Sequence, residues 1–219
     1  MRQKQTFTLV ELLVVIGIIA ILAGLVIPAV IRAQQQGRIT QAKSDMATIL
    51  LALKGVESTY NKMVNGDSSF DGKTAKTDSA FPNCIILGGG NDTSVDAYDC
   101  FIAELSVPNK VSTPNINKRK IKFLDPNPKF DPTKNYSDAD NLPYLWRDPW
   151  GNRYVIIINT QLKDEIPNPA TYDTTPKKSL AAKAIVYSYG PNGEDNKAKN
   201  ILYDVGSPTS TCDDIASWH

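Results

Sequence analysis

The chain begins with a short polar segment and continues into an uninterrupted apolar run from Leu12 to Ile31. This run carries no charged residue, and it consists mostly of Leu, Ile, Val and Ala, with Pro28 near its far end. At about 1.5 Å rise per residue it would form a helix of roughly 30 Å, which matches the hydrocarbon thickness of a bilayer. The pattern therefore predicts a membrane-spanning helix.

The pattern changes after Arg32, where apolar residues recur every three or four positions and polar residues stand between them. This spacing predicts that the helix continues beyond the membrane with one face packed on a sheet, and that it ends near Asn65-Gly66. The apolar positions of this second half are Ile39, Ala42, Met46, Ile49, Leu50, Leu53, Val56, Tyr60 and Met63.

Residues 67–142 lack strong periodicity and are rich in Gly, Pro, Asn and Asp, which disfavours long helices. We expect an irregular insertion here, with a short helix over 98–105 and a strand over 121–124.

Residues 143–219 are more regular. The turn Asp148-Pro149-Trp150-Gly151-Asn152 precedes the apolar run 154–158, and the runs 184–189 and 201–205 follow it. These runs predict a small antiparallel sheet that the helix covers, so the fold class is α+β.

Composition narrows the possible functions. Lys+Arg number 24 against 23 for Asp+Glu, so no strongly basic face is implied and nucleic acid is not an expected partner. No nucleophile pairs convincingly with a base, and the single histidine is the terminal His219, so an enzyme is not expected.

Three cysteines in an exported domain suggest one disulfide and one remaining thiol. Cys84 and Cys100 are the better pair, because a disulfide between them would close a short loop rich in Gly and Asp. Two alternatives stay open: that all three are reduced, or that Cys212 takes part.

Glu11 is a carboxylate within an otherwise apolar segment, which is costly unless it stays hydrated or finds a partner. The sequence around it, Phe7-Thr8-Leu9-Val10-Glu11-Leu12-Leu13 after a short basic leader, resembles the N-terminus of type IV pilins and type II secretion pseudopilins. The resemblance implies a pilin-like fold, cleavage by a prepilin peptidase between Thr6 and Phe7, and N-methylation of Phe7. The family usually has glycine where this chain has Thr6.

The same resemblance implies assembly into a filament through the N-terminal helices, with Glu11 paired to the Phe7 amine of a neighbouring copy. Pro28 deletes one intrahelical hydrogen bond, so it is expected to kink the span or to mark where it loosens on assembly. The chain is then divided into a leader (1–6), a transmembrane helix (7–31), an amphipathic half of the helix (32–66), the insertion (67–142) and the sheet with its C-terminal loop (143–219).

A second resemblance covers roughly residues 143–219. The turn at 148–152, the segment Ser188-Tyr189-Gly190-Pro191-Asn192-Gly193 and the pair Asp213-Asp214 look like the C-terminal domain of the major pseudopilin family. That family binds calcium in this loop, so the resemblance implies a calcium site formed by Asn192, Asp213 and Asp214. Aspartate is expected where Asn192 stands. The alternative is that these residues only form turns and solvated loop surface.

The prediction is a structural subunit of a type II secretion pseudopilus that helps to drive protein export. The resemblance implies homo-oligomerisation in a helical filament, with minor pseudopilins and an inner-membrane assembly platform as further partners. Arg2 and Lys4 favour a cytoplasmic N-terminus, which places the globular domain in the periplasm. A type IV pilin for adhesion, motility or DNA uptake is one alternative. A singly anchored extracytoplasmic binding protein or enzyme is the alternative of another class.

Overall fold

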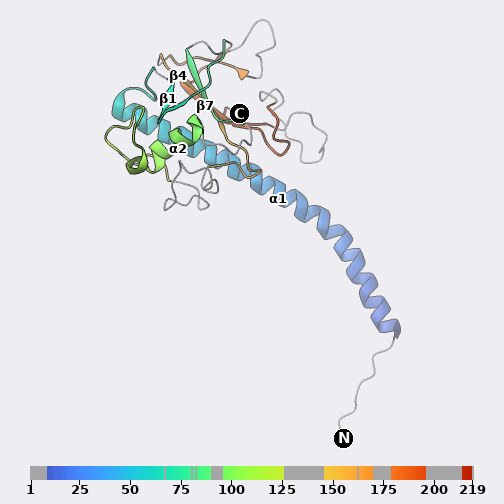
Figure 1. The fold of residues 1–219 in the computed structure, drawn as a ribbon. Coiled ribbons are helices and arrows are strands. Elements are labelled where there is room, and N and C mark those ends of the chain that lie inside the picture. The colour runs from blue at the N-terminus through green and yellow to red at the C-terminus, as the bar shows by residue number, and fades with distance from the viewer. Residues whose placement is uncertain are drawn as a thin grey trace.

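The computed structural model describes residues 9–66, 68–79, 81, 83–89, 96–125, 146–161, 163–169, 179–195 and 214–218. One helix dominates it: α1 (Leu9–Tyr60) is 52 residues long and continues without a break through Pro28. Figure 1 shows α1 leaving the globular part of the chain as a single protruding, gently curved rod. The membrane half and the amphipathic half are thus one continuous helix, as the pattern predicts.

The amphipathic half of α1 buries one face. Its buried residues are Ile39, Ala42, Met46, Ile49, Ala52, Leu53 and Val56. Leu50 and Tyr60 are partly buried against the same cluster, so the predicted stripe is confirmed. The helix ends at Tyr60, earlier than predicted, because Asn61 adopts the left-handed conformation (φ 56°) and its backbone N–H donates to Glu57 O at 2.7 Å. This geometry is a common helix ending.

A four-stranded antiparallel sheet forms the centre of the globular part, in the order β3-β4-β7-β8. Its strands are β3 (Cys84–Leu87), β4 (Val155–Asn159), β7 (Ala184–Ser188) and β8 (Ile215–Ala216). β4 and β7 confirm the strands predicted over 154–158 and 184–189. The strand predicted over 201–205 lies outside the described residues.

Shorter elements surround this sheet. They are β1 (Ser69–Phe70), β2 (Lys73–Thr74), α2 (Ala97–Ser106), the 3-10 turn η1 (Pro108–Lys110), β5 (Ile166–Pro167) and β6 (Ser179–Leu180). α2 confirms the helix predicted over 98–105. Asp96 caps α2, since its carboxylate accepts the backbone N–H groups of Tyr98 and Asp99.

Two predictions for residues 67–142 are wrong. The segment is not wholly an irregular insertion, because β3 belongs to it and pairs along its full length with β4. Residues 121–124 do not form a strand, because the N–H groups of Phe123 and Leu124 both donate to Leu105 O at the end of α2, at 2.9 and 3.1 Å.

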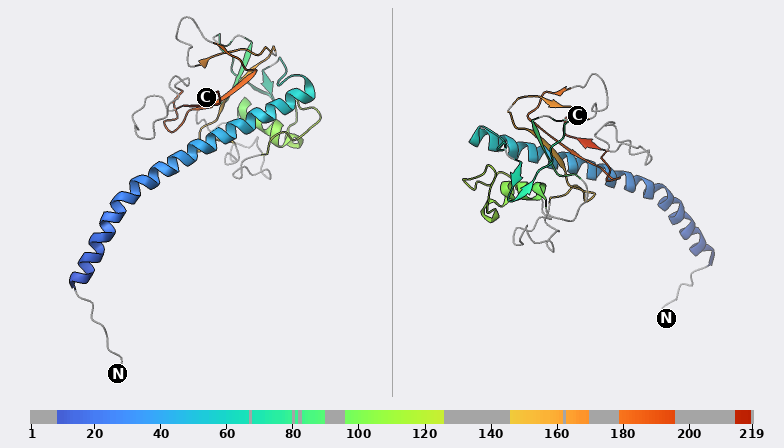
Figure 2. Two further views of the ribbon diagram at one scale, coloured as in Figure 1. Left: turned by 180° about the vertical axis from the view of Figure 1, so that it is seen from behind. Right: turned by 45° about the horizontal axis from the view of Figure 1, so that its top comes forward.

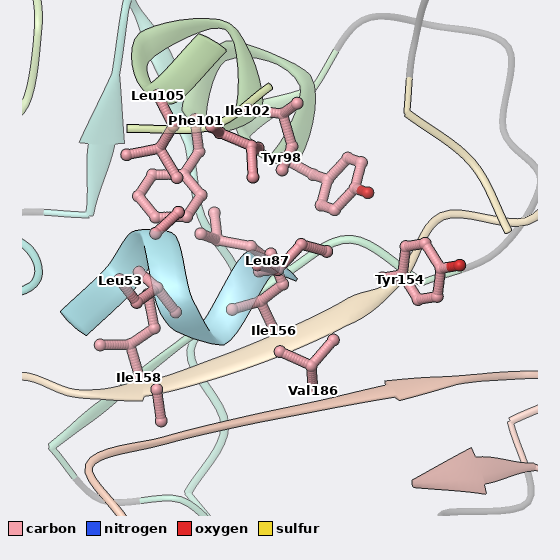
Figure 3. Packing of buried hydrophobic residues seen from close by; sticks show 14 of the residues in the cluster. Leu53, Leu87, Tyr98, Phe101, Ile102, Leu105, Tyr154, Ile156, Ile158 and Val186 are labelled. Carbon is pink, nitrogen blue, oxygen red and sulfur yellow. The ribbon is translucent and has the colours of Figure 1, made fainter. Parts of the chain in front are cut away.

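The central sheet is buried on both faces. Ile156 and Ile158 of β4 face a cluster that includes α1 and α2, whereas Val155 and Ile157 face a second cluster with Ile166 of β5. This alternation follows from the period of two along a strand. Figure 2 shows the sheet lying against the upper half of α1, and Figure 3 shows side chains of α1, α2 and the sheet meeting in the first cluster.

Candidate functional site

The N-terminal half of α1 exposes apolar side chains over its whole length. Its large apolar residues between Leu9 and Ile31 are 45–79% exposed. An 18-residue window in this helix has a mean hydropathy of 3.0 and none of it is buried. Because exposing each such side chain to water costs about 1.5–3 kcal/mol relative to burial, this segment requires a bilayer or other apolar helices around it. It is the principal candidate interaction surface of the chain.

Glu11 lies on this surface, in the first turn of α1, and its side chain is exposed. Thr6 and Phe7, the residues of the predicted processing site, lie outside the described residues. Pro28 is inside α1 and exposed, and the helix passes through it without interruption. Figure 2 shows that the N-terminal half of α1 curves gently and has no sharp break.

The predicted calcium residues fall on two segments that the sheet brings together. Asp214 directly precedes β8, and Ile215 of β8 pairs with Ser188 at the end of β7. The loop that contains Asn192 leaves β7 at that same end. Asn192 is exposed and its side-chain oxygen accepts the Glu194 N–H at 2.7 Å, whereas Asp214 is fully buried. Asp213 lies outside the described residues. Among the described residues, no group of three or more His, Cys, Asp or Glu is placed to hold a metal ion.

The predicted turn at 148–152 is confirmed, and it is fastened to the end of β7. Within the turn, Asp148 accepts the backbone N–H groups of Trp150 and Asn152 at 3.0 and 2.7 Å. The Ser188 hydroxyl donates to the same carboxylate at 2.5 Å, and Asn152 donates to Gly190 O at 3.1 Å. Burial raises the pKa of Asp148, while these hydrogen bonds oppose the shift. The turn thus fixes the start of the loop that contains Asn192.

A buried ion pair between α2 and the residue before β4 was not predicted from the sequence. Arg153 contacts Asp99 at 2.6 Å and the capping residue Asp96 at 3.3 Å. Burial raises the pKa of Asp99 to about 6, and the neighbouring Arg153 guanidinium opposes that shift. One signal was present, because Arg153 stands directly before a strand of buried residues. Its partner could not be inferred, since Asp99 lies 54 positions away in the chain.

A second missed contact ties α1 to the sheet. The Tyr154 hydroxyl donates to the Asp45 carboxylate at 2.9 Å. Burial raises the pKa of Asp45, while the hydrogen bond from Tyr154 opposes the shift. The Tyr98 hydroxyl of α2 donates to Trp146 O at 2.8 Å, which ties α2 to the segment that leads to β4.

The predicted disulfide between Cys84 and Cys100 is wrong for this structure, in which both are free and buried. Cys84 lies in the cluster on the β5 side of the sheet, whereas Cys100 lies in the cluster on the helix side. The sheet therefore separates the two thiols. Burial raises the pKa of Cys84 to about 11 and that of Cys100 to about 12. Cys212 lies outside the described residues.

Comparison with known proteins identifies the N-terminal segment. Residues 1–27 match the prokaryotic N-terminal methylation motif. Over 52 residues the chain is 46% identical to the type II secretion system core protein G of Pseudomonas aeruginosa. That similarity covers 24% of this chain and 37% of the relative, so it spans little more than a third of the relative's length. No solved structure matches the chain significantly.

The motif covers most of the exposed half of α1, and the similarity to the relative lies in the N-terminal region. Together with the hydropathy of the span, they indicate that the start of the chain is similar to the N-terminal segment of type IV pilin-like proteins. A long N-terminal helix packed on a small antiparallel sheet agrees with that conclusion. The chain therefore carries the N-terminal methylation motif of type IV pilin-like proteins at the start of a pilin-like fold.

Proposed function

We propose that this chain is a subunit of a type II secretion pseudopilus that helps to drive protein export. The observation that carries the proposal is the exposed apolar half of α1, which begins with a methylation motif and continues into a folded domain. Before assembly the bilayer covers this segment, and in the filament the same segment of other copies covers it. An open-ended helical filament suits such a surface, because each subunit offers one face and receives another.

Processing at the N-terminus completes the assembly surface. A prepilin peptidase cuts between Thr6 and Phe7, and Phe7 becomes the methylated terminus. Glu11 is four residues further on in the chain, in the first turn of α1, and its side chain is exposed, as pairing with the terminus of a neighbouring copy requires. A cationic amine opposite Glu11 offsets the cost of a carboxylate in an apolar environment and sets the register between copies.

The proposed topology follows from the charges that flank the span. Arg2 and Lys4 hold the N-terminus in the cytoplasm, so the globular part lies in the periplasm. The proposed partners are further copies of this chain, minor pseudopilins, the inner-membrane assembly platform and the prepilin peptidase.

The first test is the intact mass of the protein from its native membrane, together with electron microscopy of sheared cell surfaces and periplasmic extracts. Loss of Met1–Thr6 with gain of one methyl group, and thin filaments that contain the chain, are expected. An unprocessed mass and an absence of filaments would contradict the proposal, and the chain would then be a fixed anchor for a pilin-like domain.

The Glu11 pairing has its own test. Glu11→Ala is expected to reduce filament formation strongly without changing processing, because cleavage precedes assembly. Glu165→Ala, which removes an exposed carboxylate outside the membrane segment, is the matched control. Normal filaments from Glu11→Ala would exclude the pairing and leave the rest of the proposal standing.

Calcium binding at Asn192, Asp213 and Asp214 is also proposed. The support is the pairing of β7 with β8, which places Asp214 beside the start of the Asn192 loop, and the chemistry of amide and carboxylate oxygens, which are ligands that calcium prefers. Thermal unfolding of the full-length protein in detergent, with calcium or with a chelator, tests this site. A higher melting temperature in calcium that Asp213→Asn abolishes is expected, and an identical melting temperature in both conditions would exclude the site.

A further inference from the structure

Four cationic side chains lie together on one exposed turn at the end of the globular part. They are Lys118, Arg119, Lys120 and Lys122. We call residues 117–122 the basic turn. Ile121, between Lys120 and Lys122, is 37% exposed, and residues 118–122 are all exposed. Lys122 forms an exposed ion pair with Asp125 at 2.6 Å, so the positive charge is concentrated on the other three residues.

The conformation of the basic turn is fixed from beneath by Asn117, which is fully buried. Its amide donates to Glu104 O at 2.9 Å and to Ile121 O at 2.7 Å, and its oxygen accepts the Ile121 N–H at 3.0 Å. Because these bonds already hold the backbone, little backbone ordering is needed when the cations bind a partner.

The basic turn lies at the end of α1 that is farthest from the membrane segment. Tyr60 is the last residue of α1, and its hydroxyl donates to the side-chain oxygen of Asn117 at 3.0 Å. The Arg119 guanidinium lies 5.8 Å from the centre of the Tyr60 ring, within the range of a cation–π contact. The basic turn is therefore the membrane-distal tip of the globular part.

An acidic loop lies at the opposite end. Lys183, just before β7, contacts Glu57 near the end of α1, and Tyr187 near the end of β7 pairs with Val155. The preceding residue, Tyr154, binds Asp45 of α1. β7 therefore runs back along α1 toward the membrane segment. The end of β7 lies beside Asp45, roughly 22 Å before Tyr60 along the helix at 1.5 Å per residue.

The exposed carboxylates of Glu194 and Asp195 lie on the loop that follows this end of β7. Asp195 accepts the Tyr187 hydroxyl at 3.2 Å, and the Glu194 backbone is held by Asn192, so this loop is anchored as well. We call residues 193–195 the acidic loop.

We propose that the basic turn of one copy of this chain contacts the acidic loop of another copy further along the filament. This inference rests on the proposed function. In an open-ended filament of parallel copies, the membrane-distal end of one globular part faces the membrane-proximal end of another. The basic turn and the acidic loop carry opposite charges, which favours this register and disfavours contacts between two basic turns or two acidic loops.

A role within one subunit is the alternative explanation of the basic turn. Cations near the end of a helix stabilise its dipole, and α1 has no basic residue in its last turn. That role predicts that loss of the cations lowers the melting temperature of the unassembled protein. The proposed contact predicts that the melting temperature stays unchanged and that assembly is impaired.

The test places a photo-crosslinking amino acid at Lys120 of the full-length chain in its native membrane. Two populations of the chain, one isotope-labelled, are expressed together so that links between copies differ in mass from links within a copy. A link from position 120 to residues 190–195 of a second copy is expected. Links to another part of the chain, links to other proteins, or no link in cells that form filaments would overturn the contact.

Charge reversal provides the second measurement. Lys118→Glu with Lys120→Glu, and separately Glu194→Lys, are each expected to reduce filament yield about fivefold at low salt, the upper end for an exposed ion pair. The combined variant is expected to recover yield. Lys163→Glu, an exposed lysine outside both segments, is the matched control.

Asp195 is left unchanged because its carboxylate accepts a hydrogen bond from the Tyr187 hydroxyl. Equal losses of filament yield in the single and combined variants would overturn the contact, and so would a lowered melting temperature of the unassembled charge-reversed variants. In either case wild-type filaments would still support the proposed function. Absence of wild-type filaments would overturn both.

Discussion

The Arg153 guanidinium lies 2.6 Å from the Asp99 carboxylate, and the two side chains are only 1% and 0% exposed. Asp99 is in the first turn of α2, and Arg153 directly precedes β4. This pair therefore joins α2 to the central sheet through the interior of the protein. Removal of either partner would leave an uncompensated buried charge.

Arg153→Met is expected to lower the free energy of unfolding by about 3–5 kcal/mol at neutral pH, because Asp99 is left buried without its cation. Chemical denaturation of the full-length protein in detergent, followed by circular dichroism, measures the change. Lys122→Met is the control, since it breaks an ion pair of the same 2.6 Å length whose side chains are 53% and 89% exposed. Equal decreases in the free energy of unfolding of the two variants would show that burial of the Arg153 pair does not increase its effect on stability.

Asp99 also makes stability depend on pH. Burial raises its pKa from 3.8 to about 6, so the folded state binds this proton more tightly than the unfolded state does. The free energy of unfolding of the wild type, relative to that of Asp99→Asn, is therefore expected to be greatest below pH 3.8. It should fall as the pH rises through about 6.

The measurement is a set of denaturation curves at several pH values across that window, for both proteins. If the difference in the free energy of unfolding between the two proteins is constant with pH, or grows as the pH rises, then Arg153 rather than burial determines the pKa of Asp99. Asp125→Asn is a suitable control, because its side chain is 89% exposed.

Gly88 and Gly72 have nearly the same backbone angle, with φ of 83° and 82°, but different surroundings. A β-carbon at Gly88 would overlap with the carbonyl oxygen of Tyr154, whereas one at Gly72 would meet nothing within 4 Å. Gly72→Ala is expected to cost about 1–2 kcal/mol, the strain of the left-handed conformation alone.

Gly88→Ala adds a backbone clash to that strain and is expected to cost about 4 kcal/mol or to prevent folding. Thermal unfolding of the two variants separates the contributions. Similar melting temperatures for both would show that the sheet shifts freely around position 88.

The two buried cysteines are expected to resist alkylation in the folded protein. Both thiols are 4% exposed or less, and their pKa values are raised to about 11 and 12, so little reactive thiolate is present at neutral pH. In a Cys212→Ser background, iodoacetamide should add nothing before unfolding and two groups after it, as read by intact mass. A single mass shift of two hydrogens on reduction, with no alkylation after unfolding, would instead indicate the disulfide that the sequence suggested.

Local patterns predicted several elements correctly, each for a short-range reason. The three- and four-residue spacing after Arg32 predicted the buried face of α1, because a helix with 3.6 residues per turn presents those positions together. The apolar runs at 154–158 and 184–189 predicted β4 and β7. The run Cys84–Leu87 was missed as a strand, since it is short and followed by glycines, and only its pairing with β4 stabilises it.

Some features of the candidate interaction surfaces could likewise be predicted from the sequence, whereas others could not. The methylation motif and the apolar span were readable directly, because both are specified by contiguous residues. The basic turn and the acidic loop, by contrast, consist of ordinary charged residues in the sequence. Their positions at opposite ends of the domain follow from the packing of Asn117 on Tyr60 and of β7 along α1.

The sequence by itself determined that the chain has a long apolar helix at its start, that this helix continues as an amphipathic one, and that a small antiparallel sheet follows. These features depend on neighbouring residues and on the two periodicities of the backbone. Only the tertiary structure decided that β3 completes the sheet, that Cys84 and Cys100 lie on opposite faces of it, and that Arg153 meets Asp99. Those relationships join residues far apart in the chain, and their geometry exists only once the helix has packed against the sheet.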